Sequence, residues 1–391
     1  MRVVYLDNNA TTAVAPEVLD AMLPFLAERY GNPSSMHAFG GNVASDIRKA
    51  REQVAELLGA DPSEIIFTSC GTESDSTAIR SALESYPAKR RVVTTRVEHP
   101  AIRSFCKWLA DRGYSVTELS VDSEGLLDLA EAEAALTPDT AVVSVMYANN
   151  ETGVIFPVER IAEMCRERGI LFHTDAVQAV GKIPLDLRRS TMDMLSLSGH
   201  KLHAPKGVGV LYVRKGSRFT PSLIGGHQEH GRRAGTENVA SIVALGRACE
   251  LAKQWMEDEN TRLKALRDRV ERELLARVSD SRLNGSSKHR LPNTTNISFE
   301  FVEGEAILLL LDQAGICASS GSACTSGSLE PSHVLRAMGV PFTFAHGSIR
   351  LSLSRYNTEA DVDYVIATLP GVIQRLRSIS PFSREKAAAK G

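Results

Sequence analysis

The chain has 391 residues, of which 43% are hydrophobic and 24% are charged. This ordinary globular composition excludes collagen-like, low-complexity and largely disordered proteins, and the length predicts two or three domains. With 45 Lys and Arg residues against 47 Asp and Glu residues, the charge gives no support for a nucleic-acid or membrane-surface partner.

Short apolar runs alternate with helical patterns between about residues 15 and 270. The runs are nearly continuous in apolar character, as strands buried on both faces are. They predict strands at 64–68, 91–95, 141–146, 170–174, 194–198 and 208–213, with helices at 45–58, 101–111 and 158–168. This order predicts an α/β fold whose mainly parallel sheet is flanked by helices.

The pattern changes in the last third of the chain. A long helical pattern over 238–278 has a densely charged second half, 262–277, which we interpret as a solvated helix face. Beyond it, the sequence predicts a smaller α+β domain with strands at 296–301 and 348–353 and helices at 305–314 and 358–379. The predicted division is a large domain at 15–262, a small domain at 1–14 and 263–379, and a flexible tail at 380–391.

Two features bear on the cellular location. Asp7 interrupts the N-terminal residues before an apolar signal region forms, and the apolar run at 306–311 is too short to span a membrane. None of the six cysteines forms a C-x-x-C pair, which leaves no zinc, thioredoxin or dense disulfide pattern. We therefore expect a cytoplasmic protein with reduced thiols.

Reactive and anion-binding residues follow three of the predicted strands. Lys201 lies on the turn after strand 194–198, and Asp175 ends the preceding strand. A lysine with a carboxylate for a pyridinium nitrogen is the pattern of a pyridoxal phosphate site. Gly71 and Thr72 begin a helix whose amides suit a phosphate, although an ordinary helix cap and a solvated lysine are the plainer alternatives. Together, these strand ends predict one site for a phosphorylated cofactor.

Two pairs of histidines have a spacing that raises the question of a metal. His200 with His203, and His227 with His230, are each three residues apart, but neither pair has companion ligands at a diagnostic spacing. We therefore predict no intrinsic metal site.

A series of motifs runs along nearly the whole chain, from Tyr5 to about Pro381. The motifs are 5–12, 31–35, 70–75, 98–100, 149–153, 231–238 and 319–324, together with the Asp175 and Lys201 segments. In this order they resemble the class V aminotransferase-type, fold-type I pyridoxal phosphate enzymes. More narrowly, the chain resembles the cysteine desulfurases, most closely those of the NifS type.

The resemblance implies a role for each matching residue. Lys201 would hold pyridoxal 5'-phosphate as a Schiff base, Asp175 would pair with the pyridine nitrogen, and His99 would stack on the ring and help to move protons. Further cofactor contacts would come from Gly71, Thr72, Ser198 and His200 at the phosphate with Glu73 adjoining, from Asn150 and Gln178 at the ring hydroxyl, and from Thr236 of the other subunit in a homodimer.

The resemblance also implies how L-cysteine would be held as substrate. Arg350 would bind its carboxylate, with Asn150 beside it, because a planar guanidinium suits a carboxylate. Two plainer alternatives stay open for single residues. His99 could be a packed histidine at a strand end, and Arg350 could be a surface charge that points outward from its strand.

Cys324 differs from the other cysteines in its surroundings. The small polar residues 319–323 and 325–328 offer nothing to bury its thiol, so we expect an exposed thiol that can approach a substrate. We interpret the remaining five as packing residues: Cys70, Cys106, Cys165, Cys249 and Cys317.

With Cys324, the resemblance implies a cysteine desulfurase that forms L-alanine and an enzyme persulfide. The sulfur would pass to an iron–sulfur scaffold protein, with nitrogenase maturation as the expected pathway. A transient role for Cys324 as an iron–sulfur ligand with that scaffold also stays open. The alternatives are a selenocysteine lyase or an aminotransferase of the same fold, and a non-catalytic protein that carries an iron–sulfur cluster.

Overall fold

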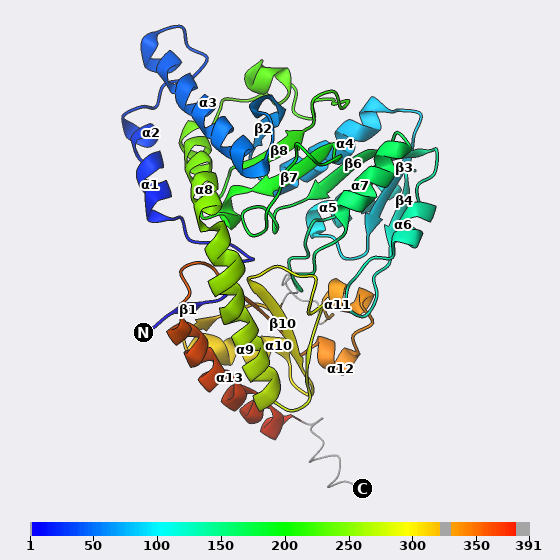
Figure 1. Ribbon diagram of the computed structural model, residues 1–391, viewed down its shortest axis with the longest axis vertical. Coiled ribbons are helices and arrows are strands. Elements are labelled where there is room, and N and C mark those ends of the chain that lie inside the picture. The colour runs from blue at the N-terminus through cyan, green and yellow to red at the C-terminus, as the bar shows by residue number, and fades with distance from the viewer. Residues whose placement is uncertain (1, 321–329, 381–391) are drawn as a thin grey trace.

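Figure 1 shows a computed structural model of the chain, which describes residues 2–320 and 330–380. The expected tail from residue 381 onward and the predicted catalytic residue Cys324 lie outside the described residues.

A seven-stranded mixed sheet forms the centre of the upper part in Figure 1. Six of its strands were predicted to within a few residues, and every residue of β5, β6, β7 and β8 is buried. In spatial order the strands are β2 (Ile65–Thr68), β8 (Gly209–Val213), β7 (Met194–Ser198), β6 (Leu171–Asp175), β5 (Thr140–Ser144), β3 (Arg91–Thr95) and β4 (Ser115–Leu119). Only β8 runs antiparallel to its neighbours, so the expected α/β fold with a mainly parallel sheet is confirmed.

Helices cover both faces of this sheet. One face packs against α4 (Gly71–Ser85) and α5 (Pro100–Ala110), whose buried residues include Ile79 and Ile102. The other face packs against residues such as Ile47, Ile161 and Leu245. The helices there are α3 (Ala38–Leu58), α7 (Val158–Glu167) and α8 (Val239–Asp258), with α1 (Pro16–Met22), α2 (Pro24–Ala27) and α6 (Leu129–Ala134) at the periphery. Two covered faces explain the continuous apolar strands.

A second core lies in the lower part of Figure 1. Its three-stranded antiparallel sheet has the order β12 (Ser348–Ser352), β10 (Thr294–Phe299) and β9 (Ser281–Leu283), and β1 (Val4–Tyr5) pairs in parallel with β11 (Ile316–Cys317). Its helices are α9 (Lys264–Arg277), α10 (Gly304–Gln313) and α13 (Glu359–Ile379). The short helices α11 (His333–Ala337) and α12 (Phe342–Ala345) follow in the chain before β12, but their buried residues pack in the first core.

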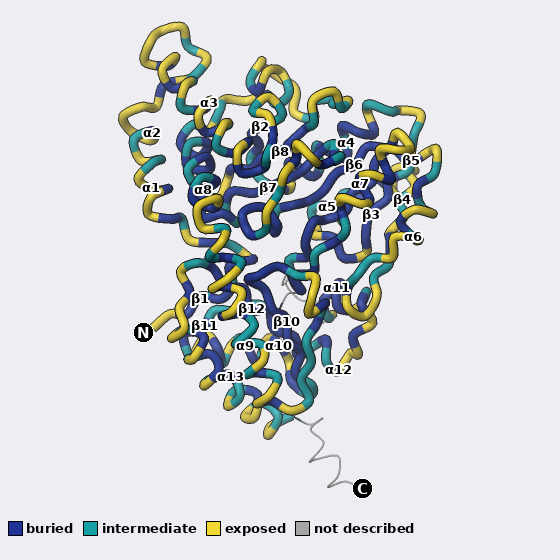
Figure 2. The backbone as a smooth tube through the Cα atoms, in the orientation of Figure 1, coloured by how far each residue is buried: buried dark blue, intermediate teal, exposed yellow. Residues whose placement is uncertain are grey.

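The two hydrophobic cores bear on the predicted domain division. Val4 and Leu6 pack in the second core with residues between Leu263 and Ile373, whereas Val334 and Leu335 of α11 pack against the core of the large sheet. Figure 2 shows the two buried interiors joined by a narrower region. The division at residue 262 stays a prediction, which the separate cores support.

The structure differs from the sequence expectation in two segments. Strand β4 was not predicted because it lies at the sheet edge, where only its last residue is buried and the apolar run is broken. The charged segment 262–277 is not simply a solvated face, because the Arg267 side chain is 2% exposed. Arg267 donates to the carbonyl oxygens of Leu291 (2.9 Å) and Thr294 (3.0 Å), which satisfy its buried guanidinium.

No helix in the described part of the chain is both long enough and apolar enough to cross a membrane.

The contact between α3 and α8 depends on a glycine. A Cβ atom at Gly246 would lie 2.6 Å from the Cα atom of Ala50. We expect Gly246→Ala to lower the free energy of unfolding by about 1–3 kcal/mol, because the two helices must move apart. Urea unfolding measures this change.

Gly371 supplies the matched control, because it lies inside α13 with no atom within 4 Å of an added Cβ. Gly371→Ala should raise the stability by about 0.5–1 kcal/mol through helix propensity alone. Equal effects of the two substitutions would contradict the packing argument.

Candidate functional site

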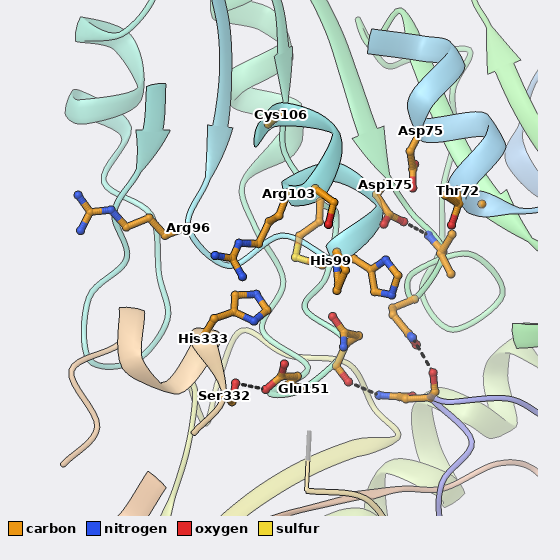
Figure 3. Close-up of a pocket in the computed structure, with 18 of the residues that line it drawn as sticks. Thr72, Asp75, Arg96, His99, Arg103, Cys106, Glu151, Asp175, Ser332 and His333 are labelled. Atoms are coloured by element: carbon orange, nitrogen blue, oxygen red, sulfur yellow. Dashed lines mark hydrogen bonds between the residues drawn. The ribbon is translucent and has the colours of Figure 1, made fainter. Parts of the chain in front are cut away.

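A cavity of 1090 Å³ opens between the large sheet and the second core. Its walls include residues from the carboxyl ends of β6 and β7, from the starts of α4 and α5, and from β12. Figure 3 shows Thr72, His99 and Asp175 gathered on one side of it, with Glu151, Ser332 and His333 on the other. Ligands of mainly parallel sheets bind at this edge, where the strands end.

The cavity brings together most of the predicted site residues. Ten of them line it: Gly71, Thr72, His99, Asn150, Asp175, Gln178, Ser198, His200, Lys201 and Arg350. Glu73 and Thr236 are not among its lining residues, and Cys324 lies outside the described residues.

Lys201 lies on a single 3-10 turn, Gly199–Lys201, directly after β7. Its Nζ atom donates to the carbonyl oxygens of Asn9 (2.5 Å) and Ala10 (2.7 Å). Burial, together with the positive charges of Lys182 and Arg350, lowers the pKa of Lys201 to about 7. Near neutral pH, much of this amine is therefore unprotonated and able to act as a nucleophile or a base.

Asp175 ends β6 and is 5% exposed. Its Oδ1 atom accepts from the backbone N–H of Val177 at 2.9 Å. Burial raises the pKa of Asp175, while His99, this hydrogen bond and Lys201 act in the opposite direction. A cation that reached this carboxylate would hold it in its ionised form.

His99 is the N-cap residue of α5, and its ring is exposed to the cavity rather than packed. Its Nδ1 atom accepts from the backbone N–H of Ala101 at 3.2 Å, which leaves Nε2 as the protonated nitrogen of a neutral ring. The surrounding protein desolvates the ring and lowers its pKa, with Asp175 opposing and Lys201 adding to this effect. The alternative of a packed histidine is therefore wrong.

The start of α4 offers free backbone donors to an anion. Its N-cap residue, Cys70, makes no side-chain cap, so the first N–H groups of the helix keep their hydrogen-bonding capacity for a ligand. A Cβ atom at Gly71 would lie 2.9 Å from Val177 Cγ2, so glycine allows the helix start to approach the end of β6. Ser198 and His200 line the same cavity.

Glu73 and Thr236 do not line the cavity. Glu73 accepts from the backbone N–H of Ser69 at 2.7 Å and pairs with Arg233 at 2.9 Å, so its carboxylate is bound on the side of the helix start. Thr236 lies near Arg233 in the chain, on the segment between β8 and α8. The resemblance implies that Thr236 contacts the cofactor phosphate bound by the other subunit. Thr236 does not line this cavity, which agrees with that expectation but does not test it.

Arg350 lies on β12 and is 4% exposed, so the alternative of an outward-facing surface charge is wrong. Its guanidinium donates to Asp7 Oδ1 at 2.7 Å and to the Asn150 carbonyl oxygen at 3.0 Å. Its buried Nε atom has no hydrogen-bond partner among the described residues. The arginine is thus held at the cavity wall with donor capacity to spare.

Asn150 and Gln178 are positioned by contacts with the N-terminal segment. The carbonyl oxygen of Asn150 accepts from Asn9 Nδ2 at 3.1 Å, and Gln178 Nε2 donates to the Asn9 carbonyl oxygen at 3.0 Å. Both residues line the cavity.

The cysteines divide differently from the prediction. Cys106, Cys165 and Cys249 are buried as predicted, and burial raises the pKa of each thiol to about 12. Cys70 and Cys317 are only partly buried, because one lies on the turn between β2 and α4 and the other on a two-residue edge strand. The prediction of five packing residues is therefore wrong for these two.

Several residues of the site were not assigned a role from the sequence. Asp7, Asn9 and Ala10 belong to a quoted motif, but their contacts with Arg350 and Lys201 join residues about 190 to 340 positions apart, which no local pattern predicts. The Glu151 carboxylate accepts from the Ser332 hydroxyl across the cavity, and burial raises its pKa to about 7.

The residues fit a phosphorylated pyridine cofactor on three counts. The helix start of α4 has uncapped amides, Asp175 is a buried carboxylate that a ring cation would ionise, and Lys201 has an amine that reacts near neutral pH. Among residues 2–320 and 330–380, no three His, Cys, Asp or Glu side chains form a group that could hold a metal ion.

Comparisons with known proteins agree with this geometry. Residues 4–365 match the family described as Aminotransferase class-V. The cysteine desulfurase of Nostoc sp. is 62% identical over 99% of this chain and 97% of its own, and the cysteine desulfurase NifS of Azotobacter vinelandii is 61% identical over 97% and 94%.

Solved structures show the same similarity. A NifS-like protein superposes with a TM-score of 0.90 at 41% identity, over 96% of this chain and all of that one. A structure titled SspA in complex with cysteine superposes with a TM-score of 0.80 at 35% identity, over 91% of this chain and all of that one.

The buried carboxyl group of Glu98, beside the cavity residue His99 in the chain, predicts that the stability of the protein depends on pH. Glu98 is fully buried; its Oε1 atom accepts two hydrogen bonds, whereas Oε2 has none among the described residues. Burial raises the pKa of Glu98 to about 8. Because the folded state then binds a proton that the unfolded state has lost, Glu98 lowers stability as pH rises from about 4.5 to about 8.

We expect Glu98→Gln to lose less stability than the wild type over that pH range, with a difference of about 1 kcal/mol or more. Urea unfolding at a series of pH values measures it, and Glu118→Gln, which removes a partly exposed carboxylate of β4, is the control. An unchanged pH slope in Glu98→Gln would show that Glu98 is ionised in the folded protein.

Proposed function

The chain belongs to the class-V aminotransferase family and to its cysteine desulfurases, and from this membership we propose that it transfers the sulfur of L-cysteine to its own Cys324. One observation carries the proposal. Lys201, with a pKa of about 7, and the buried Arg350 line one cavity, to which Ser319 and Glu330 also contribute. These two are among the described residues that flank the segment containing Cys324.

Pyridoxal 5'-phosphate is the proposed cofactor, and each end of it has proposed partners. The first amides of α4, with Thr72, Ser198 and His200, would hold the phosphate. Asp175 would pair with the ring nitrogen, His99 would contact the ring, and Asn150 and Gln178 would bind its hydroxyl. When bound, the cofactor would withdraw electrons from the α-carbon of an attached amino acid.

The chain's own groups would then bind the substrate and move its proton. Arg350 binds the substrate carboxylate through donors that Asp7 and Asn150 leave free, and these two contacts orient the guanidinium before substrate arrives. The neutral amine of Lys201 removes the proton from the α-carbon, for which a pKa near 7 is suited. His99 Nε2 carries a proton that it can deliver within the cavity.

Sulfur transfer is proposed to occur at Cys324. The Cys324 thiolate attacks the substrate sulfur, a new S–S bond forms, and the substrate C–S bond breaks with its electron pair passing to the carbon side. Protonation of that carbon gives L-alanine, and the enzyme keeps a Cys324 persulfide. L-cysteine and one thiol thus become L-alanine and one persulfide, with no external oxidant or reductant.

The acceptor of this sulfur is proposed to be an iron–sulfur scaffold protein. The relatives from Nostoc and Azotobacter vinelandii support this assignment, and the name NifS supports nitrogenase maturation as the pathway. A transient iron–sulfur contact of Cys324 belongs to the same proposal. A reducing compartment such as the cytoplasm keeps the thiol available.

A second copy of the chain is the proposed partner, and exposed apolar side chains are available to contact it. Leu23, Leu26 and Tyr30, near α1 and α2, are 49%, 59% and 67% exposed, and Ile224 on the segment that leads to Thr236 is 87% exposed. In a homodimer, Thr236 would complete the partner's phosphate site.

The alternatives are a selenocysteine lyase or an aminotransferase of the same fold. An aminotransferase has no use for a reactive thiol such as the one proposed for Cys324. The lyase-like members carry their cysteine in a short Arg-x-Gly-His-His-Cys segment, which this chain lacks. A non-catalytic iron–sulfur carrier does not account for the reactive amine of Lys201.

Lys201 offers a direct test of cofactor attachment. Wild-type protein loaded with pyridoxal phosphate should be yellow, and borohydride reduction should fix the cofactor covalently to Lys201. Lys201→Ala should show no covalent cofactor by peptide mass spectrometry, whereas Lys206→Ala, which removes an exposed lysine from the same connection between β7 and β8, should behave as wild type. Attachment to another lysine would sink this assignment.

Cys324 separates the desulfurase from the alternatives. Cys324→Ala should keep the cofactor absorbance but lose L-alanine and sulfide formation by about 1000-fold, as is typical when a nucleophile is removed. Cys317→Ala, on strand β11, is the matched control and should retain activity. Normal turnover in Cys324→Ala would mean that another group accepts the sulfur.

A further inference from the structure

A second lysine, Lys182, is buried behind Lys201 and has no part in the proposed function. It is 7% exposed, and its Nζ atom donates to the Gln178 carbonyl oxygen (3.0 Å) and to Gln178 Oε1 (3.1 Å). Burying an ammonium group is costly, and an apolar side chain would fill the space without that cost. The buried ammonium group of Lys182 therefore indicates a role other than packing.

The contacts of Lys182 lead directly to Lys201. Because Lys182 engages Oε1 of Gln178, the amide nitrogen of Gln178 points to the Asn9 carbonyl oxygen at 3.0 Å. That same carbonyl oxygen accepts from Lys201 Nζ. A chain of hydrogen bonds thus joins the two lysines through the amide of Gln178, which fixes the amide in one of its two orientations.

The other side of Lys182 faces the joint between the two cores. Helices α8 and α9 meet at a π-turn, Glu259–Leu263, and such turns occur frequently at functional sites. Asn260 Nδ2 donates to the Lys182 carbonyl oxygen at 2.9 Å. Glu259, which is 8% exposed, lines a small cavity of 20 Å³ together with Lys182 and Lys201, and a space of that size holds about one water molecule.

The charges in this cavity act on one another. Burial lowers the pKa of Lys182 to about 8 and raises that of Glu259 to about 7, and each charge favours ionisation of the other. After burial, the Lys182 charge is the largest cause that lowers the pKa of Lys201. The other charged or titratable groups that interact with Lys201 include Arg350, Asp7, Asp175, His200 and His99.

We propose that Lys182 is a positioning residue for Lys201. Its ammonium group fixes the Gln178 amide and places a positive charge behind the reactive amine, while Glu259 supplies the counter-charge at the joint of α8 and α9. The inference rests on the proposed role of Lys201. It adds that the joint between the cores sets the reactivity of that amine.

The first test measures Lys201 itself rather than turnover. The full-length protein, freed of cofactor, is treated with an amine-acylating reagent over a range of pH, and labelling of Lys201 is read by peptide mass spectrometry. The wild-type midpoint is expected near pH 7. Lys182→Met should move it upward by about 1 unit, because a nearby like charge is removed.

Control variants separate charge from shape and from folding. Lys182→Arg keeps the charge and should stay near the wild-type midpoint. Lys253→Met removes an exposed lysine charge of α8 that pairs with Glu56, and it should have no effect. The variant Lys182→Met with Glu259→Gln removes both buried charges, so it guards against misfolding and should show the same upward shift. An unchanged midpoint in the folded Lys182→Met and double variants overturns the proposal.

The second test addresses the Gln178 amide. Lys182→Met and Gln178→Leu should each weaken binding of pyridoxal phosphate by about 10-fold, and combining them should add little, because both remove the same oriented amide. Fully additive losses would overturn this part of the inference.

These tests separate the inference from the proposed function. A shifted Lys201 midpoint in a protein that forms no L-alanine would uphold the electrostatic role and reject the desulfurase. L-alanine formation with an unshifted midpoint would do the reverse.

Discussion

The site depends on one short N-terminal segment, residues 7–12, which lies between the two cores and holds reactive groups from both. Asp7 binds Arg350 of the second core, and the Asn9 carbonyl oxygen accepts from Lys201 and Gln178 of the large sheet. Thr12 accepts from the backbone N–H of His203 and donates to the His200 carbonyl oxygen, which fixes the turn after β7. A small shift of this segment would therefore displace the substrate clamp and the reactive amine together.

Burial and the neighbouring positive charges both lower the pKa of Lys201, whereas at Asp175 burial raises the pKa and the neighbouring positive charges lower it. Desolvation and the charges of Lys182 and Arg350 favour the neutral amine. The Asp175 carboxylate has to be ionised to hold a ring cation, and that form is favoured by His99, by the hydrogen bond from Val177 and by Lys201. The same cavity thus contains the neutral amine of Lys201, which can act as a base, and the Asp175 carboxylate, which can stabilise a positive charge. This division suits removal of a proton from carbon near neutral pH.

Much of this arrangement was predictable because it follows from local sequence. Continuous apolar runs gave the buried strands β6 and β7, and the residues at their ends, Asp175 and Lys201, gave the site. The edge strand β4 was missed because its burial is mixed. The contacts of Asp7 with Arg350 and of Glu151 with Ser332 were out of reach, since each joins residues far apart in the chain and depends on how the cores meet. From the sequence alone, Lys182 would be taken for an ordinary surface lysine, and only the structure shows that it is buried.

A single-turnover experiment tests the central claim most directly. One equivalent of L-cysteine per subunit is added to the cofactor-loaded protein without a reductant, and both L-alanine and the sulfur bound to each cysteine-containing peptide are measured. The account predicts one L-alanine per subunit and one extra sulfur atom on the peptide that contains Cys324. L-alanine formed without sulfur on that peptide, or sulfur on Cys70 or Cys317 instead, would contradict it.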